Sequence, residues 1–416
     1  MAAFSTPASR ARDAAARAER VEARRRAMRG PGARRGMAVG TVVGLVVGLS
    51  AGLLGGVALG SGAASPGASP SVGFFSGGDD DNTADTADTD TPNGPVRPAE
   101  QITLAFAGDV HFENHLASLA DDPDSLSELQ SSLGAADLGM VNLETALTQG
   151  GSPVPGKPFT WRAHSGALDA VAGAGVDLVT MANNHAVDYG EVGLADTFDA
   201  IDASPIPVIG IGRDESEAFA PEILEVRGVK VAFVSASQVY EETTSYYAAG
   251  PGTPGIASAL PRDRILQAVR EAREQADVVV AYMHWGLEGY TCPGDEAIAS
   301  AHDLEAAGAD VILGDHAHRV NGAGWVGAAY VHFGLGNFVY YLNREPAGHT
   351  GVLTVTVDVP ASDEPRPDRP LVTNADWDAM LISGDGIPRR QDAATTARLQ
   401  QVFEASRECT PARATP

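Results

Sequence analysis

The 416-residue sequence contains very little cysteine and very little lysine, and both shortages exclude classes of protein. The two cysteines, Cys292 and Cys409, are too few for a cysteine-rich zinc site. The only lysines, Lys157 and Lys230, lie in no Gly-Lys-Ser/Thr loop, which excludes a P-loop nucleotide-binding protein. In an oxidising compartment the two cysteines can form one disulfide that ties the C-terminal helix to the main domain; the alternative is that they remain unpaired.

Two glycine patterns lack the structural context that would give them a function. Residues 48–52 have the form of a nucleophile elbow, but they lie inside an apolar run and not at a strand–turn–helix junction. Residues 322–327 have the spacing of a dinucleotide-binding loop, but no suitable βαβ unit begins there. We therefore reject both motifs.

Charge is divided unevenly along the chain, and the division predicts a membrane protein. Residues 1–36 hold ten arginines against three acidic residues, whereas the rest of the chain holds 19 basic and 51 acidic residues. Residues 37–59 carry no charge, and about 20 apolar residues span a bilayer. The positive-inside rule places residues 1–36 in the cytoplasm and the main domain outside the cell. A cleaved signal peptide is the alternative, and it also exports the domain.

The predicted transmembrane helix has a glycine at every fourth position, which would let a second helix approach closely. This stripe suggests a homo-oligomer, or a polymer synthase or export partner, as the neighbour in the membrane. The alternative is that a sequence rich in Ala, Gly and Val produces the pattern by chance. The stripe consists of Gly40, Gly44, Gly48, Gly52, Gly56 and Gly60.

Residues 60–99 are dominated by Gly, Ser, Asp, Thr and Pro and predict a disordered linker. From residue 100 to 409 short apolar runs alternate with helical periodicity, which predicts a single α/β domain. Residues 360–370, rich in Pro and Asp, are expected to form an exposed loop. Strands are predicted at 102–107, 138–142, 176–181, 207–211, 229–235, 278–283, 311–313, 329–333 and 352–359, and helices at 125–133, 167–174, 194–201, 262–275, 299–307 and 392–409.

Potential metal ligands follow five of the predicted strands. Functional groups in open α/β sheets gather just past the carboxyl ends of strands. Histidine, carboxylate and Asn side chains supply the nitrogen and oxygen donors that Mn, Fe or Zn prefers. The candidates outnumber one tetrahedral shell, so two divalent ions sharing a carboxylate fit the count better. The side chains are Asp109 and His111; Asn142 and Glu144; Asn183, Asn184, His185 and Asp188; His284 and Glu288; and Asp315, His316 and His318.

The order of these residues resembles that of the calcineurin-like metallophosphoesterases, and their finer motifs are similar to those of the CapA family of bacterial capsule and poly-γ-glutamate synthesis proteins. The resemblance covers residues 102–345. It implies a metallophosphoesterase-like sandwich of two β-sheets flanked by helices. The motifs are Gly108-Asp109-Val110, Asn142-Leu143-Glu144, Ala182-Asn183-Asn184-His185 with Asp188-x-Gly190, His284-Trp285-Gly286-x-Glu288 and Gly334-x-Gly336-Asn337-Phe338.

The resemblance also implies roles for individual residues. One metal would be held by Asp109, His111 and His318. The other would be held by Asn184, His284 and His316, with Glu144 bridging the two ions. His185 would act as the general acid toward the leaving oxygen.

Several roles remain open at the level of sequence. Glu144 stands where the phosphoesterases have Asp, and Gly289 separates Glu288 from Tyr290 where CapA proteins more often join them. Arg319 could bind a substrate phosphate or carboxylate, or form a salt bridge. Asn337 could contact substrate, or merely follow a buried strand. Trp161 and Trp285 could line a cleft, or pack in the core.

Two functions are compatible with the sequence. One is a metal-dependent hydrolase that takes part in making or exporting an anionic cell-surface polymer, as the resemblance implies. The other is a non-catalytic scaffold of a membrane-bound synthesis or export complex. The strongly acidic main domain would repel nucleic acid, so we expect no nucleic-acid partner.

Overall fold

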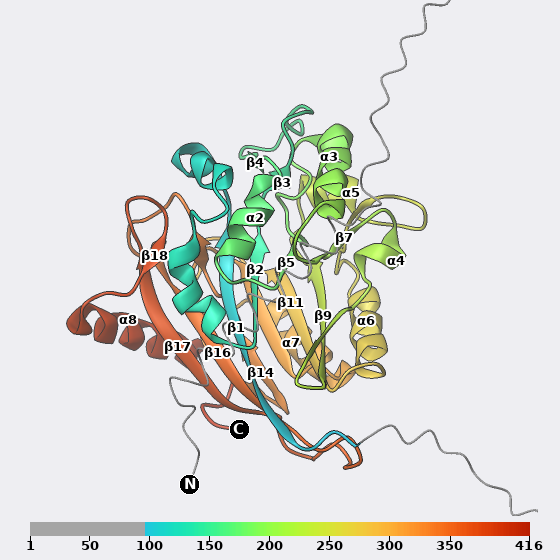
Figure 1. Ribbon diagram of the computed structural model, residues 1–416, viewed down its shortest axis with the longest axis vertical. Coiled ribbons are helices and arrows are strands. Elements are labelled where there is room, and N and C mark those ends of the chain that lie inside the picture. Colours follow the sequence, from blue (N-terminus) through green and yellow to red (C-terminus); the bar gives the residue numbers. More distant parts are fainter. Residues whose placement is uncertain (1–95) are drawn as a thin grey trace, which may run out of the picture. The chain divides into compact units, whose positions relative to one another are not determined.

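The computed structural model describes residues 96–416, in which two β-sheets lie face to face with helices on both outer faces (Figure 1). The predicted α/β architecture and the predicted pair of sheets are therefore confirmed.

The first sheet has eight strands in the order β18-β17-β16-β1-β2-β5-β6, and β15 also pairs with β1. Neighbours from β1 to β6 run parallel, as do β1 and β15, whereas β16, β17 and β18 are antiparallel to their neighbours. The strands are β1 (Glu100–Val110), β2 (Leu138–Leu143), β5 (Leu178–Thr180), β6 (Val208–Ile209), β15 (Asn337–Val339), β16 (His349–Val359), β17 (Val372–Ile382) and β18 (Pro388–Arg389).

The second sheet has six strands in the order β13-β14-β12-β11-β9-β8. Its four central strands are parallel, and an antiparallel strand lies at each edge. The strands are β8 (Glu222–Val226), β9 (Val229–Ser237), β11 (Val278–Trp285), β12 (Val311–His316), β13 (Ala323–Val326) and β14 (Ala329–His332). There are also two small two-stranded sheets. One pairs β3 (Ala146–Leu147) with β4 (Arg162–Ala163), and the other pairs β7 (Ile211–Gly212) with β10 (Gly255–Ile256).

The helices divide between the outer faces of the two sheets. The side chains of α2, α3 and the first 3₁₀ turns pack on the eight-stranded sheet, and those of α6 and α7 pack on the six-stranded sheet. The α-helices are α2 (Gly166–Gly173), α3 (Gly190–Asp202), α4 (Glu215–Ala218), α5 (Glu242–Tyr247), α6 (Asp263–Arg273), α7 (Asp295–Ala307) and α8 (Ala393–Ser406). The 3₁₀ turns are η1 (Asn114–Asp121), η2 (Ser127–Ser131), η3 (Leu133–Ala135) and η4 (Arg407–Cys409).

Alternation along the strands explains how one chain builds three apolar layers. In β11, Val280 and Tyr282 face the space between the sheets, whereas Val279 and Ala281 face α6 and α7. Successive side chains of a strand point to opposite faces, so a strand buried on both sides is apolar throughout. All eight residues of β11 are buried, as this pattern requires.

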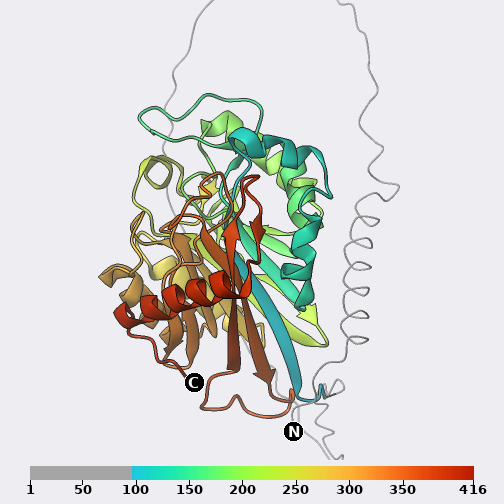
Figure 2. The same ribbon diagram turned by 90° about the vertical axis from the view of Figure 1, so that its left-hand side faces the viewer.

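The C-terminal segment is tied to the sandwich in two ways. Helix α8 lies across the β17 side of the molecule (Figure 2), where the Phe403 ring stacks on Trp377 at 5.4 Å. Cys409 forms a disulfide with Cys292, in the segment between β11 and α7. The disulfide that the sequence left open is thus formed. Beyond Cys409, the backbone of Arg413 pairs with Trp325 of β13.

Three expectations about secondary structure were wrong. Residues 125–133 form short 3₁₀ turns and not an α-helix. The strand predicted at 207–211 is split into β6 and β7 by Gly210, whose φ of +80° and close approach to Ala182 suit only glycine. Strand β17 was not predicted at all, because the polar residues Thr373, Asn374 and Asp376 interrupt the apolar alternation along it.

The predicted cytoplasmic segment, transmembrane helix and most of the predicted linker lie outside the described residues. Within residues 96–416 no helix is both long enough and apolar enough to cross a bilayer.

Candidate metal centre

The candidate centre lies where the carboxyl ends of the parallel strands of both sheets meet. Asp109 is the second-last residue of β1, Glu144 follows β2, and the loop after β5 carries Asn184. From the other sheet, His284 lies near the end of β11 and His316 ends β12. Parallel strands that share a direction bring their ends to one edge, so residues far apart in sequence come together there.

Asp109 is buried and contacts the side chains of Asn142 and His318. Its Oδ1 accepts a hydrogen bond from Asn142 Nδ2 at 2.9 Å, and its Oδ2 lies 3.1 Å from His318 Nδ1. Strand β15 pairs with β1 and begins at Asn337, which is in register with Asp109. This close pairing requires Gly108, because a Cβ there would lie 1.8 Å from the carbonyl oxygen of Gly336.

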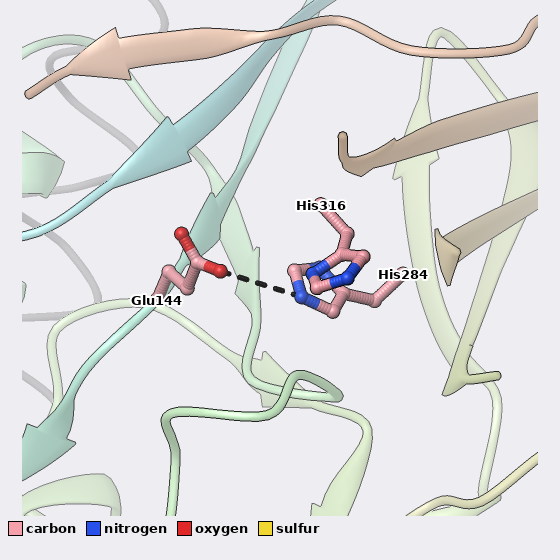
Figure 3. Close-up of side chains that lie close together, drawn as sticks. All are labelled: Glu144, His284 and His316. Atoms are coloured by element: carbon pink, nitrogen blue, oxygen red, sulfur yellow. Dashed lines mark ion pairs between the residues drawn. The ribbon is translucent and has the colours of Figure 1, made fainter. Parts of the chain in front are cut away.

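Glu144, His284 and His316 point toward one another, Glu144 from the segment after β2 and the two histidines from β11 and β12 (Figure 3). His284 Nε2 lies 3.3 Å from Glu144 Oε1 and 2.7 Å from Asn184 Oδ1. Its other nitrogen, Nδ1, lies 2.6 Å from Asp315 Oδ1. Asp315 therefore fixes the orientation of the His284 ring through the nitrogen opposite to the one that lies near Glu144 and Asn184.

His316 and His318 are placed by an unusual backbone. Their φ angles are +80° and +52°, a left-handed conformation that residues other than glycine rarely adopt. Such conformations persist where surrounding structure enforces them, and they concentrate at functional sites. The turn lets both imidazoles approach the buried carboxylates, with His318 Nδ1 2.8 Å from Asn337 Oδ1.

Potential ligand atoms fall into four overlapping groups, in each of which they lie within 4.8 Å of one another. Both oxygens of Glu144, one of Asp109, one of Asp315 and the Nδ1 of His316 have no hydrogen-bond partner within the described residues. Buried polar atoms are normally bonded, so these side chains fit bound divalent cations. The groups are Glu144, His284 and His316; Asp109, Glu144 and His318; Asp109, His284 and Asp315; and Glu288, His316 and His318.

The electrostatics of the cluster also favour a cation. Burial, then the charges of Asp109 and Asp315, raises the pKa of Glu144 well above its ordinary value. Burial and the charge of Asp109 likewise raise the pKa of Asp315. Burial lowers the pKa of His284 and brings that of His316 to about 3, so both imidazoles are neutral. A divalent cation would relieve the repulsion between the carboxylates and would bind neutral imidazoles.

Asp109 differs from the other two carboxylates of the cluster. Burial alone would raise its pKa, but the neighbouring His318 side chain outweighs burial and holds the pKa below its ordinary value. Asp109 is therefore the carboxylate that remains ionised most readily.

His185 lies beside the cluster in a separate hydrogen-bonded chain. Its Nδ1 is 2.6 Å from Asp188 Oδ2, and the other Asp188 oxygen is 2.6 Å from Lys157 Nζ. The Trp161 ring stacks on His185 with centroids 3.6 Å apart, and the Trp161 amide donates to Asp188 at 2.6 Å. Burial raises the pKa of Asp188 to about 7, against the opposing charge of Lys157. Burial and Lys157 lower the pKa of His185.

His111 is the predicted ligand that the structure leaves outside these groups. Its Nδ1 accepts a hydrogen bond from the Glu113 amide at 3.0 Å, and its Nε2 lies 3.5 Å from the Tyr341 amide nitrogen. The ring stacks on Trp161 at 4.8 Å and packs edge-on against Tyr340. Both ring nitrogens therefore lie next to backbone amides, and neither belongs to one of the four ligand groups.

The two residues predicted to bind substrate have different surroundings. Asn337 is fully buried, and its Nδ2 donates to the Ala347 carbonyl at 3.0 Å while its Oδ1 faces His318. Both ends of its amide are engaged within the protein, so Asn337 positions His318, and its contact with substrate stays a prediction. Arg319 is partly exposed, and its Nη1 donates to the His318 carbonyl at 2.7 Å. Within residues 96–416 it forms no salt bridge.

Several residues of the site were missed or left open by sequence reasoning. Asp315 and Asn142 were among the candidates at strand ends, but no role was assigned to them, because their contacts with His284 and Asp109 depend on which strands are neighbours in each sheet. Lys157 lies in a loop with no periodic signal. Trp161 lies against His185, whereas Trp285 belongs to the core, with its Nε1 donating to the Phe333 carbonyl at 2.9 Å.

Comparisons with known proteins show what this chain resembles. A family model described as bacterial capsule synthesis protein PGA_cap matches residues 103–341. The PGA biosynthesis protein CapA of Bacillus subtilis (strain 168) is 26% identical over 256 residues, covering 60% of this chain and 66% of that protein. A probable polyglutamine synthesis accessory protein of Mycobacterium tuberculosis is 32% identical over 196 residues, covering 44% of this chain and 50% of that protein. The chain thus spans half to about two thirds of these relatives.

Two solved structures are more distant. A phosphatase from Mycoplasma pneumoniae has a TM-score of 0.42 at 16% identity, covering 68% of this chain and 94% of that one. A putative 5'-nucleotidase from Staphylococcus aureus has a TM-score of 0.43 at 16% identity, covering 74% of this chain and 58% of that one. TM-scores below 0.5 indicate no more than a distant resemblance.

Proposed function

Since the chain belongs to the bacterial capsule synthesis (PGA_cap) family, we propose that it is a two-metal hydrolase serving the synthesis or export of an anionic cell-surface polymer such as poly-γ-glutamate. The observation that carries this proposal is the set of buried carboxylate and imidazole atoms without hydrogen-bond partners where the two sheets meet. A protein that only supported its partners would have no need to bury so many unpaired polar atoms.

Two divalent ions of the Mn, Fe or Zn class would be held by residues of both sheets. Asp109 and His318 would hold one ion, and Asn184, His284 and His316 the other. Glu144 would bridge them, since it belongs to a ligand group on each side. Such ions, when bound, polarise a substrate oxygen and lower the pKa of water.

The protein's own residues would position the substrate and move a proton. His185 uses Nδ1 to contact Asp188, so Nε2 is the nitrogen available to a leaving oxygen. Negative charge developing near Nε2 favours the imidazolium and opposes the effect of burial on the pKa of His185. The stacked Trp161 ring keeps His185 in one orientation. Arg319, next to His318, is the cationic side chain placed to attract an anionic substrate.

The charge pattern of the sequence supports a location for this activity. We propose that residues 37–59 anchor the chain in the membrane as a single span and that the catalytic domain is extracellular. The Cys292–Cys409 disulfide supports an oxidising surrounding. The glycine stripe of the anchor would contact a second copy or a synthase or export partner.

The test is hydrolysis by the full-length protein loaded with Mn²⁺, Fe²⁺ or Zn²⁺, against phosphodiesters, phosphomonoesters and amides. Activity on one class that disappears in Asp109→Asn, and falls by about 100- to 10,000-fold in His185→Asn, would support a hydrolase with a general acid. Stoichiometric metal without turnover on any class would instead identify a non-catalytic scaffold.

A further inference from the structure

One carboxylate beyond the predicted ligands lies close enough to bind a metal at this site. We propose that Glu288 is a ligand of the ion held by Asp109 and His318, in the place that the sequence suggested for His111. This inference rests on the proposed two-metal function and adds a residue to it.

The first support is distance. The carboxylate of Glu288 and the imidazoles of His316 and His318 offer ligand atoms that all lie within 4.8 Å of one another. His318 is shared with the group that contains Asp109 and Glu144. Glu288 therefore adds an exposed carboxylate to a cluster in which Asp109 and Glu144 are buried.

The second support is the way the backbone holds Glu288. Gly286 and Gly289, on either side of it, have φ angles of +98° and +82°, which only glycine adopts freely. The Gly289 amide donates to the Ala317 carbonyl at 2.8 Å, so this loop is bonded to the turn between His316 and His318. The glycine that separates Glu288 from Tyr290 is thus the residue that links the loop to the two histidines.

The loop is fixed again on its far side. The Tyr290 carbonyl accepts a hydrogen bond from Asn321 Nδ2 at 3.0 Å. Two residues further on, Cys292 is bonded to Cys409 at the end of α8. These attachments lower the entropic cost of holding an exposed carboxylate in one place.

The third support is the environment of the two competing side chains. Glu288 is exposed, and no lysine or arginine of residues 96–416 pairs with it. His111, in contrast, has both nitrogens beside backbone amides. Glu288 is therefore free to occupy a coordination position of the ion, whereas the nitrogens of His111 are already engaged.

The experiment is calorimetric titration of the metal-free, full-length protein with Mn²⁺. The variants are Glu288→Gln, His111→Phe, which keeps the aromatic packing, and the matched control Glu296→Gln on the exposed start of α7. We expect two Mn²⁺ per wild-type chain. In Glu288→Gln the loss of the carboxylate contact with the ion should lower the Mn²⁺ affinity of one of the two sites about 10- to 100-fold. The other site should be unchanged in that variant, and both sites should be unchanged in His111→Phe and Glu296→Gln.

The outcomes separate the two claims. If wild type binds two ions and Glu288→Gln retains both affinities, Glu288 is not a ligand, while the two-metal proposal stands. If His111→Phe loses an ion and Glu288→Gln does not, the assignment reverts to His111. If the wild-type protein binds no Mn²⁺, Zn²⁺ or Fe²⁺, the proposed function itself fails.

Discussion

The ammonium group of Lys157 lies 2.6 Å from Oδ1 of Asp188, and both side chains are almost completely buried. Lys157 also contacts Glu241 at 2.9 Å and the backbone carbonyl of Asn184. One of the chain's two lysines thus holds together the loop that carries His185 and the segment at the start of α5.

Replacing Lys157 with Met should destabilise the protein by about 3–5 kcal/mol, because it leaves a buried carboxylate without its cation. The free energy of unfolding in urea measures the effect. Lys157→Met/Asp188→Leu removes both charges and should recover part of the loss, whereas Lys230→Met, at an exposed position, should change stability by less than about 0.5 kcal/mol. Equal stability of Lys157→Met and wild type would show that the pair contributes nothing.

His332 should make the folded protein sensitive to acid. Its side chain is fully buried between Trp377 and Phe403, and burial lowers its pKa to about 3. The unfolded chain takes up a proton at this residue below about pH 6.5, and the folded chain does so only near pH 3. Stability is therefore lost as pH falls from 6.5 toward 3, by up to about 1.4 kcal/mol per pH unit.

His332→Phe removes the pH-dependent contribution of His332 to stability and keeps the packing of its ring. Between pH 7.5 and pH 5 the wild type should lose about 2 kcal/mol more than the variant, since about 1.5 pH units of the window are crossed. Urea unfolding of both proteins at both pH values provides the comparison, in which the other titrating groups are shared. Parallel pH profiles of the two proteins would refute the role of His332.

Asp315 should control metal affinity through His284. In Asp315→Asn the ring of His284 loses the carboxylate that orients it, and affinity for one ion should fall about 10- to 100-fold. Competition with a chelator measures this loss. Asp199→Asn, an exposed residue on α3, serves as the control and should bind like the wild type. Unchanged affinity in Asp315→Asn would leave the carboxylate without a role in binding.

The disulfide should contribute strongly to stability, because it closes a loop across 117 positions of the chain. In Cys292→Ser/Cys409→Ser the free energy of unfolding should be about 2–5 kcal/mol lower than in the oxidised wild type. Adding a reductant should bring the wild type to the level of the variant and leave the variant unchanged. A reductant with no effect on the wild type would show that the bond is not formed in solution.

The sequence predicted the buried part of the fold well and its edges poorly. Strands such as β11 are apolar on both faces, and this pattern is visible without any structure. Strand β17 was missed because it packs on one face only and its other face is polar and charged. The turns η2 and η3 were predicted as a helix because apolar spacing alone does not distinguish a 3₁₀ turn from an α-helix.

The candidate site was also predicted only in part from the sequence. Strand ends pointed to Asp109, Glu144 and His284, because ligands after parallel strands meet at one edge. Contacts made across the two sheets, such as His284 with Glu144, depend on packing that no local pattern records. The orientation of His111 depends on Trp161 and Tyr340, which approach it from distant parts of the chain. Sequence spacing therefore located the site but did not fix which side chains face into it.

Metal content is the measurement that tests the account most directly. The full-length protein and Asp109→Asn would be purified, incubated with Mn²⁺, Fe²⁺ or Zn²⁺, freed of unbound ions and analysed for metal by elemental analysis. We predict two ions per wild-type chain and at most one in the variant, because Asp109 is the carboxylate most readily ionised in the cluster. A wild-type protein that retains none of these metals would contradict the account.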